Sequence, residues 1–348
     1  YEALKRLYPM PLDHVSLTDR AKLARRFARD ALVRPVPPAQ ERALGGRRHS
    51  KSRDAEAIHH HYDVSNRFYS FVLGPSMAYT CAVFPTPDAS LEVAQDEKFD
   101  LVCRKLGLRP GMRLLDVGCG WGGMVLHAVK NYGVSAIGVT LSRQQAEWGQ
   151  RTIEDAGLGD RAQIRFSDYR DVSESGFDAI SSIGLTEHIG RRNYAAYFRF
   201  LYDRLRPEGR MLNHTITRFD SSWPSHYKRS FINRYVFPDG ELSPPGLIIS
   251  EMNDAGFEIR HDENLREHYA LTLKYWCANL ERNWDACVEE AGLPTARVWR
   301  LYMAASRLGF DINTIQLHQT LGVKLGDRGV SGIPLRVSGE TWSLDQPQ

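Results

Sequence analysis

The chain has 348 residues, of which 42% are apolar and 25% are charged, a balance typical of a folded globular protein and not of a disordered one. No stretch approaches the roughly 18 apolar residues of a membrane-spanning helix. The five cysteines include no C-x-x-C pair, which argues against a disulfide framework or a zinc site. We expect no metal, including at the consecutive histidines 59–61.

The first predicted element is a basic amphipathic helix over residues 12–34, with four apolar residues near helical spacing: Leu17, Leu23, Phe27 and Leu32. Residues 1–54 carry 13 Lys and Arg against 6 Asp and Glu, so their net charge of +7 contrasts with −4 for the remainder. An anionic membrane surface suits such a segment. Nucleic acid and a simple solvated helix face are the alternatives.

Residues 45–54 are polar and basic and predict a linker. We therefore divide the chain into a helical leader with its linker over 1–55 and a main domain over 56–348.

From about residue 105, short apolar runs alternate with helical stretches. Strands are predicted at 113–118, 135–140, 162–168, 177–184 and 210–217, and helices at 121–131, 142–156 and 193–205. This alternation predicts an open parallel α/β sheet with right-handed crossovers. Residues 257–262 and 314–323 would add two strands. The long insertions at about 218–255 and 265–310 are predicted to form a substrate cover.

A glycine-rich turn follows the first strand of this pattern, in the sequence LLDVGCGWGG at 114–123. Gly118 and Gly120 let the backbone approach a ligand closely, at the turn where open parallel sheets bind nucleotides. Asp116 would repel a pyrophosphate but would accept hydrogen bonds from an ammonium group. These features favour S-adenosylmethionine over a dinucleotide or a purely structural turn.

The next two strands offer further cofactor contacts. The second strand ends at Thr140 without the usual acidic residue, so Thr140 and Gln145 are expected to hold the ribose. Gln145 as a solvated helix residue is the alternative. Tyr169 follows the third strand and is expected to stack on adenine.

Several motifs, in order along the chain, resemble those of the cyclopropane-fatty-acyl-phospholipid synthase and mycolic acid cyclopropane synthase family. They are HYDVSN at 61–66, YTC at 79–81, LLDVGCGWGG at 114–123, GVTLS at 138–142, EHIG at 187–190, HTI at 214–216 and HY at 268–269. The resemblance covers about residues 60–323. It implies a class I S-adenosylmethionine-dependent methyltransferase fold, a Rossmann-like seven-stranded sheet with helical lipid-pocket insertions.

The resemblance also implies the reaction and its residues. A cis double bond of a lipid acyl chain attacks the sulfonium methyl group, and the resulting carbocation loses a proton to a bound bicarbonate ion. The bicarbonate pocket maps onto five residues: Cys81, Glu187, His214, Ile216 and Tyr269. Cofactor contacts map onto Tyr79, Thr80, Gly118, Gly120, Thr140, Gln145 and Tyr169.

A carbocation requires a dry site, and aromatic faces stabilise it. Candidates in or beside the cover are Trp223, Phe231, Tyr235, Phe237, Tyr275 and Trp276, although core packing is the more common role of any one aromatic. A covalent role for Cys81 is an alternative, but an alkene needs no enzyme nucleophile.

One residue departs from the family pattern, because Thr186 stands where a Phe commonly precedes the Glu-His pair. We expect it to favour a methylene branch over a ring, so that an oleoyl phospholipid becomes a 10-methylene-stearoyl phospholipid, as in the tuberculostearic acid branch. A cyclopropane product and a small-molecule N- or C-methyltransferase are the alternatives.

The expected partners follow from this reaction. They are an unsaturated phospholipid at the membrane surface and a separate reductase for the product, with no nucleic acid. The expected location is cytoplasmic, at the inner face of the membrane.

Overall fold

The computed structural model describes residues 1–8, 16–32, 41, 48–51, 53, 64–221 and 231–335. The histidine run at 59–61, Trp223 and much of the 45–54 linker lie outside these residues, as do residues 61–63 of the HYDVSN motif.

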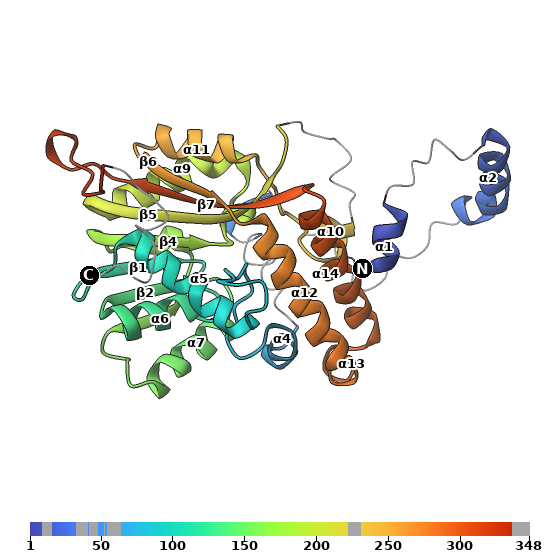
Figure 1. Cartoon of the computed structure of the whole chain (residues 1–348), viewed down its shortest axis with the longest axis horizontal. Helices are drawn as coiled ribbons and strands as arrows, with labels where there is room; N and C mark the ends of the chain where they lie inside the picture. The colour runs from blue at the N-terminus through green and yellow to red at the C-terminus, as the bar shows by residue number, and fades with distance from the viewer. Residues whose placement is uncertain are drawn as a thin grey trace.

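The centre of the molecule is a seven-stranded sheet in the order β3-β2-β1-β4-β5-β7-β6 (Figure 1). The parallel strands are β1 (Arg113–Val117), β2 (Ser135–Thr140), β3 (Ala162–Phe166), β4 (Phe177–Ile183) and β5 (Leu205–Arg218). Strand β7 (Ile315–Val323) runs antiparallel between β5 and β6 (Glu258–Asn264). All seven predicted strands are present. Strand β5 begins earlier than predicted because a register shift lets Leu205 pair with Phe177.

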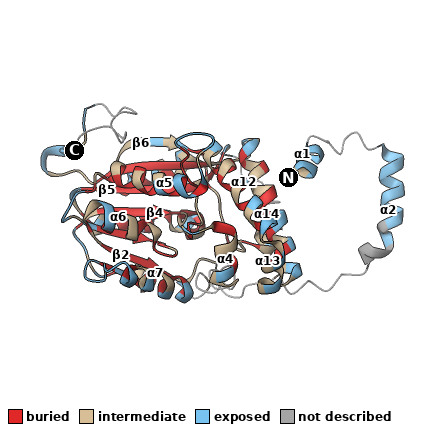
Figure 2. Cartoon of the chain, turned by 60° about the horizontal axis from the view of Figure 1, so that its bottom comes forward, coloured by how far each residue is buried: buried red, intermediate tan, exposed pale blue. Residues whose placement is uncertain are grey.

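Helices cover both faces of the sheet, so its central strands β1, β4 and β7 are largely buried, whereas the edge strands β3 and β6 are partly exposed (Figure 2). One face packs against α5 (Leu91–Leu106), α6 (Gly123–Tyr132) and α7 (Arg143–Asp155). The other packs against α9 (Tyr194–Arg204) and α11 (Pro245–Asp254). Helix α5, which the sequence analysis did not predict, begins at the side-chain cap of Ser90 and ends at Gly107 in the left-handed conformation.

A second group of helices gathers at one end of the sheet (Figure 1). It comprises α4 (Asn66–Leu73), α10 (Phe231–Tyr235), α12 (Arg266–Arg282), α13 (Trp284–Ala291) and α14 (Leu293–Asp311). The predicted insertion at 265–310 is helical and belongs to this group. Helix α11 differs from the predicted cover, because its Ile248 and Met252 are buried against the sheet.

The remaining elements are short or peripheral: α1 (Glu2–Leu7), α8 (Thr186–Ile189), and turns of 3-10 helix at Tyr169–Asp171, Arg191–Asn193 and Asp327–Gly329. The predicted leader helix is present as α2 (Leu17–Leu32), which lies apart from the main body in Figure 1. None of the helices in the described ranges is both long and apolar enough to cross a membrane.

Candidate active site

The glycine-rich turn leaves β1 in a conformation that most residues do not adopt. Gly118, Gly120 and Gly122 have φ angles of 74°, 54° and 83°. The backbone N–H groups of Gly118 and Cys119 donate to the carbonyl oxygen of Val139 at 2.9 and 3.0 Å, which ties the turn to β2. A β-carbon at Gly120 would meet no atom within 4 Å, so the space above this residue is open to a ligand.

A cavity opens over this turn and contains most of the predicted cofactor residues. Six of the eight line it: Tyr79, Thr80, Asp116, Gly118, Gly120 and Gln145. Thr140 lies behind Gln145, and its hydroxyl donates to Gln145 Oε1 at 2.8 Å. This bond leaves the buried Gln145 Nε2 without a partner among the described residues, so its N–H groups are available to a ligand oxygen.

Tyr169 does not line this cavity. Its ring makes edge contacts with Tyr197 and Phe200, at centroid distances of 5.2 and 5.5 Å. The neighbouring Asp168 caps the 3-10 turn and forms an ion pair with Arg170. The predicted stacking of Tyr169 on adenine therefore has no support in this arrangement.

The cavity also contains a cation that the sequence analysis missed. Lys98 of α5 is 1% exposed, and its Nζ donates to Thr80 Oγ1 at 3.0 Å. Burial lowers the pKa of Lys98 to about 7, although Cys81 and Asp116 oppose the shift. Burial likewise raises the pKa of Asp116 to about 6, against the hydrogen bond from Ser181 Oγ at 2.6 Å. Opposite charges at one site suit the zwitterionic end of an amino acid.

A second cavity lies under the helical group at the end of the sheet. Its volume, including the open entrance, is about 1120 Å³, and its lining is mainly apolar. Aromatic residues form much of the wall: Tyr79, Phe237, Tyr269, Tyr302 and Phe310. Tyr79, Thr80 and Gly184 line both cavities, so the two spaces meet at a common wall.

Of the aromatics predicted for the cover, only Phe237 lines this cavity among the described residues. Trp276 is fully buried against Tyr79 and Tyr269. Tyr275 stacks on Phe84 and donates to a backbone carbonyl. Phe231 and Tyr235 pack on each other, at a centroid distance of 5.2 Å. Tyr302 and Phe310 of α14 line the cavity instead of these predicted aromatics, and the sequence analysis did not identify them.

Three of the predicted base-pocket residues meet at the carboxyl end of β4 and β5. Glu187 Oε1 accepts a hydrogen bond from the backbone N–H of Ile216 at 2.7 Å. Glu187 Oε2 and His214 Nε2 are buried and have no partner among the described residues. All three residues line the apolar cavity. Glu187 Oε2 can accept a hydrogen bond from the hydroxyl group of bicarbonate, and a protonated His214 Nε2 can donate to one of its other oxygens, so the two unpaired atoms fit this ion.

Burial controls the charge of these groups. It raises the pKa of Glu187 to about 7, even though the Ile216 N–H favours the carboxylate. It also lowers the pKa of His214 well below its usual range, with Lys98 and Lys105 adding to the effect. His214 is therefore neutral at physiological pH, whereas Glu187 is poised between its two forms.

The other two predicted base-pocket residues differ in placement. Tyr269 lines the apolar cavity and stacks on Phe310 at a centroid distance of 4.4 Å. Cys81 is fully buried and lines neither cavity, and burial raises the pKa of its thiol far above the usual range. Such a thiol is a poor nucleophile, which argues against the covalent alternative.

Thr186 also lies outside the cavity walls. Its side chain is fully buried, and its hydroxyl donates to Asn213 Oδ1 at 2.6 Å. Thr186 therefore does not touch a ligand in either cavity directly. It contacts Asn213, which precedes His214 in β5, and it directly precedes Glu187 in α8.

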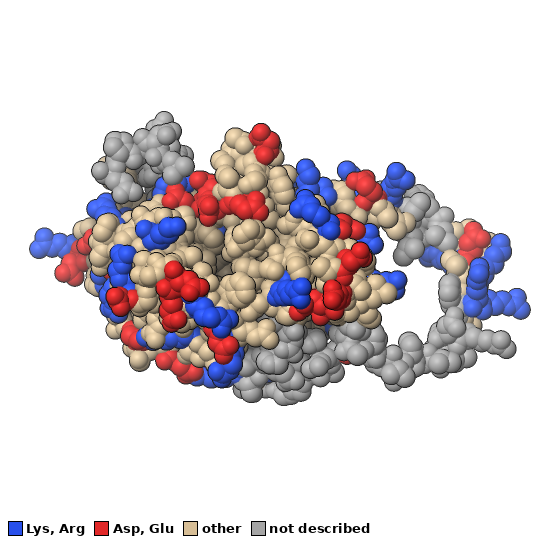
Figure 3. Space-filling view, turned by 90° about the horizontal axis from the view of Figure 1, so that it is seen from below, with Lys and Arg blue, Asp and Glu red and all other residues tan. Residues whose placement is uncertain are grey.

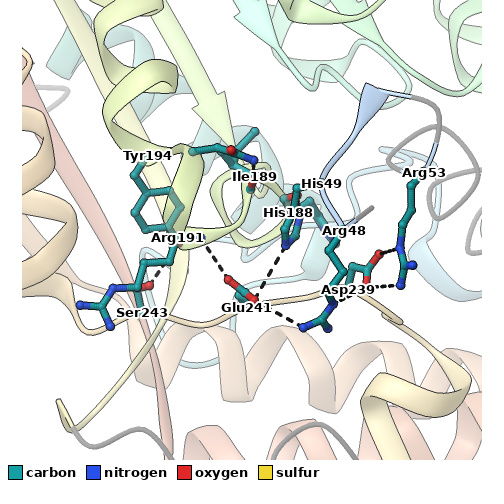
Figure 4. Close-up of polar contacts among 11 residues, drawn as sticks. Arg48, His49, Arg53, His188, Ile189, Arg191, Tyr194, Asp239, Glu241 and Ser243 are labelled. Carbon is teal, nitrogen blue, oxygen red and sulfur yellow. Dashed lines mark hydrogen bonds and ion pairs between the residues drawn. The ribbon is translucent and has the colours of Figure 1, made fainter. Parts of the chain in front are cut away.

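Arg48, His49 and Arg53 of the leader contact a loop beside the apolar cavity (Figure 4). Asp239 accepts from Arg48 at 2.9 Å and from Arg53 at 2.6 and 3.0 Å. Glu241 accepts from the Arg191 N–H at 3.0 Å, and its own N–H donates to the carbonyl oxygen of Glu187 at 2.9 Å. Because Gly240 and Leu242 of this loop line the cavity, the leader helps to hold one of its walls.

The sequence was compared with those of known proteins and protein families. Residues 49–320 match the pattern of the family described as mycolic acid cyclopropane synthetase. A "probable fatty acid methyltransferase" of Mycobacterium tuberculosis is 55% identical over 343 residues, covering 97% of this chain and 80% of that protein. One from Pseudomonas putida is 43% identical over 281 residues, covering 80% of this chain and 71% of that protein.

A solved structure shows the same fold. The mycolic acid cyclopropane synthase CmaA1, complexed with SAH and CTAB, superposes with a TM-score of 0.74 at 32% identity, covering 78% of this chain and 98% of that one. The seven-stranded sheet is accordingly a class I S-adenosylmethionine-dependent methyltransferase fold, as predicted.

Proposed function

Because this chain belongs to the mycolic acid cyclopropane synthetase family, we propose that it methylates a cis double bond in the acyl chain of an unsaturated phospholipid. In broader terms, it is an S-adenosylmethionine-dependent methyltransferase of fatty acid or lipid modification. The observation that supports the proposal best is the common wall between a polar cavity over the glycine turn and an apolar cavity that contains Glu187 and His214.

The residues of the polar cavity fit S-adenosylmethionine. Asp116 would accept hydrogen bonds from its ammonium group, and Gln145 Nε2 would donate to a ribose oxygen. The open space above Gly120 leaves room for a ligand against the backbone. When bound, S-adenosylmethionine supplies an electrophilic methyl group and bicarbonate supplies a proton acceptor.

The apolar cavity would exclude water from the reaction. The π electrons of the double bond form a new carbon–carbon bond as the bond from methyl carbon to sulfur breaks. The resulting carbocation would react with water, so a wall of Tyr79, Tyr302 and Phe310 protects it and places aromatic faces nearby. Glu187 Oε2 and His214 Nε2 would hold the anion that removes a proton, and the Ile216 N–H would position the Glu187 carboxyl group.

We propose a methylene-branched product, 10-methylene-stearoyl phospholipid from an oleoyl substrate. The cation would undergo a hydride shift before it loses a proton, whereas direct loss closes a cyclopropane ring. Support comes from Thr186, whose hydroxyl binds Asn213 next to His214 and so bears on the position of the anion. A separate reductase would then be needed to give a methyl branch.

The test is incubation of the protein with oleoyl phospholipid vesicles and methyl-labelled S-adenosylmethionine, followed by mass spectrometry of the acyl chains. We expect a one-carbon addition that carries a methylene group. Cyclopropane alone would overturn the branched product, and methylation of small amines in place of lipid would overturn the substrate class.

Glu187→Gln provides the mechanistic control. It keeps the size of the side chain but weakens the anion site, so the rate should fall by about 100-fold or more. Affinity for S-adenosylhomocysteine should not change, because Glu187 does not line the polar cavity. Removal of bicarbonate should slow the native protein in the same way, and a rate independent of bicarbonate would contradict the proposed base.

A further inference from the structure

His214 belongs to a row of polar side chains that crosses three strands. Strands β5 and β7 pair His214 with Gln319, and strands β7 and β6 pair Gln319 with Glu263. Directly paired residues of neighbouring strands point to the same face of a sheet, so these side chains lie next to one another. Lys105, in the last turn of α5, reaches the same row.

Hydrogen bonds connect the row from end to end. Lys105 Nζ donates to Gln319 Oε1 at 2.7 Å and also to Glu263. Gln319 Nε2 lies 3.1 Å from His214 Nδ1. The side chains of Lys105, Gln319 and His214 are fully buried, so water does not compete for these bonds.

The chemistry of the donors fixes the direction of each bond. An ammonium group has donors only, so the amide oxygen of Gln319 must face Lys105. The amide N–H groups must then face His214, and Nδ1 must accept with its lone pair. A neutral imidazole carries one proton, which is therefore on Nε2, the atom that is buried at the cavity without a partner among the described residues.

We infer that Lys105 and Gln319 are positioning residues that hold His214 in the Nε2–H tautomer, so that His214 donates a hydrogen bond to the bound anion and does not act as a base. The inference rests on the proposed function for the identity of that anion. The assignment of the tautomer depends only on the hydrogen bonds among the buried Lys105, Gln319 and His214.

The test is nitrogen-15 NMR of histidine-labelled protein at pH 7.5, without lipid or bicarbonate, with the His214 signals assigned by their loss in His214→Gln. In the native protein we expect an unprotonated Nδ1 and a protonated Nε2. In Lys105→Met the Gln319 amide is free to rotate, and in Gln319→Met the donor is lost, so a population with Nδ1–H should appear in both. Gln163→Met, at an exposed position of β3, should leave the spectrum unchanged.

A protonated Nδ1 in the native protein would overturn the inference without any variant, and so would native spectra in both folded variants. If the tautomer changes as expected, methyl transfer should fall by about 10-fold to 100-fold while affinity for S-adenosylhomocysteine is kept. An unchanged rate would overturn the role in positioning. A native rate independent of bicarbonate would instead overturn the proposed function and leave the tautomer assignment intact.

Discussion

Two buried carboxyl groups, those of Asp116 and Glu187, line the adjoining cavities. Desolvation is the main cause of the raised pKa of both Asp116 and Glu187, and the nearby hydrogen bonds only reduce it. Neither burial stabilises the fold, because burying a carboxylate without a full set of hydrogen-bond partners lowers the free energy of unfolding. Under the proposed function, a cationic cofactor beside Asp116 and a bound anion beside Glu187 would offset this cost.

The raised pKa of Glu187 predicts that stability depends on pH. Folding raises this pKa from 4.5 to about 7, so the protonated carboxyl stabilises the folded state fully below about pH 4.5. This stabilisation is lost as pH rises through about 7. Glu187→Gln cannot ionise, so its stability relative to the native protein should increase from pH 5 to pH 8, by up to about 3 kcal/mol at about 1.4 kcal/mol per pH unit.

Thermal unfolding of the ligand-free protein across this pH range is the measurement. The control is Glu154→Gln, an exposed position of α7 that should give a constant difference. A stability difference for Glu187→Gln that does not vary with pH would show that the carboxyl is solvated.

At the element scale, close packing of α7 against the glycine turn sets the shape of the polar cavity. Ser142 caps α7 by accepting from the Gln145 N–H, which starts the helix where Gln145 faces the cavity. A β-carbon at Gly149 of the same helix would lie 2.9 Å from the carbonyl oxygen of Trp121. The helix can therefore approach the turn only because this position has no side chain.

Gly149→Ala should accordingly push α7 away from the turn. We expect a loss of stability of about 1–3 kcal/mol from overpacking and weaker binding of S-adenosylhomocysteine, measured by thermal unfolding and calorimetry. Gly246→Ala in α11 is the matched control, because its β-carbon would meet nothing within 4 Å. Equal behaviour of the two variants would mean that α7 does not shape the cofactor site.

Arg48 and Arg53 of the leader both bind one loop of the main domain, the loop at 237–243. Asp239 is the common acceptor for two arginines, and its side chain is only 7% exposed. Asp239→Asn should therefore loosen the leader, raise KM for the phospholipid by about 3-fold to 10-fold, and speed tryptic cleavage at Arg48 and Arg53.

Affinity for S-adenosylhomocysteine should not change in this variant, because the loop lines only the apolar cavity. Asp155→Asn, an exposed position, is the control. If KM for lipid stays constant while cleavage speeds up, the leader does not support the cavity wall.

At the scale of the whole molecule, charge is distributed unevenly. Basic side chains gather on α2, at the right of Figure 3, whereas both signs alternate over the main body. Leu17 is 83% exposed on the same helix, which also carries Arg20, Lys22, Arg25 and Arg26. We propose that α2 binds the surface of an anionic membrane, and the charged face and exposed apolar residues support this.

Replacement of Arg20, Lys22, Arg25 and Arg26 by Gln tests this surface. Each cation near an anionic bilayer contributes about 1 kcal/mol, so co-sedimentation with phosphatidylserine vesicles should fall by at least 100-fold in affinity. The native protein should also release in high salt. Activity on lipid dispersed in detergent should be kept, and vesicle binding that does not respond to salt would rule out an electrostatic anchor.

The sequence by itself determined the sheet and the cofactor turn. Buried parallel strands appear as short apolar runs, and the glycine turn is continuous in sequence, so β1, Gly118, Gly120 and Asp116 were all predictable from local pattern. The motifs also identified Glu187, Ile216 and His214 before the structure placed them beside one cavity.

Only the tertiary structure decided which distant side chains complete the site. Lys98 and Lys105 lie on a helix whose sequence resembles a solvated amphipathic one, and their burial follows from the packing of α5 on the sheet. Gln319 meets His214 through strand register, and Tyr302 and Phe310 reach the cavity through the placement of α14. Burial and register depend on contacts between segments far apart in the chain, which no local pattern encodes.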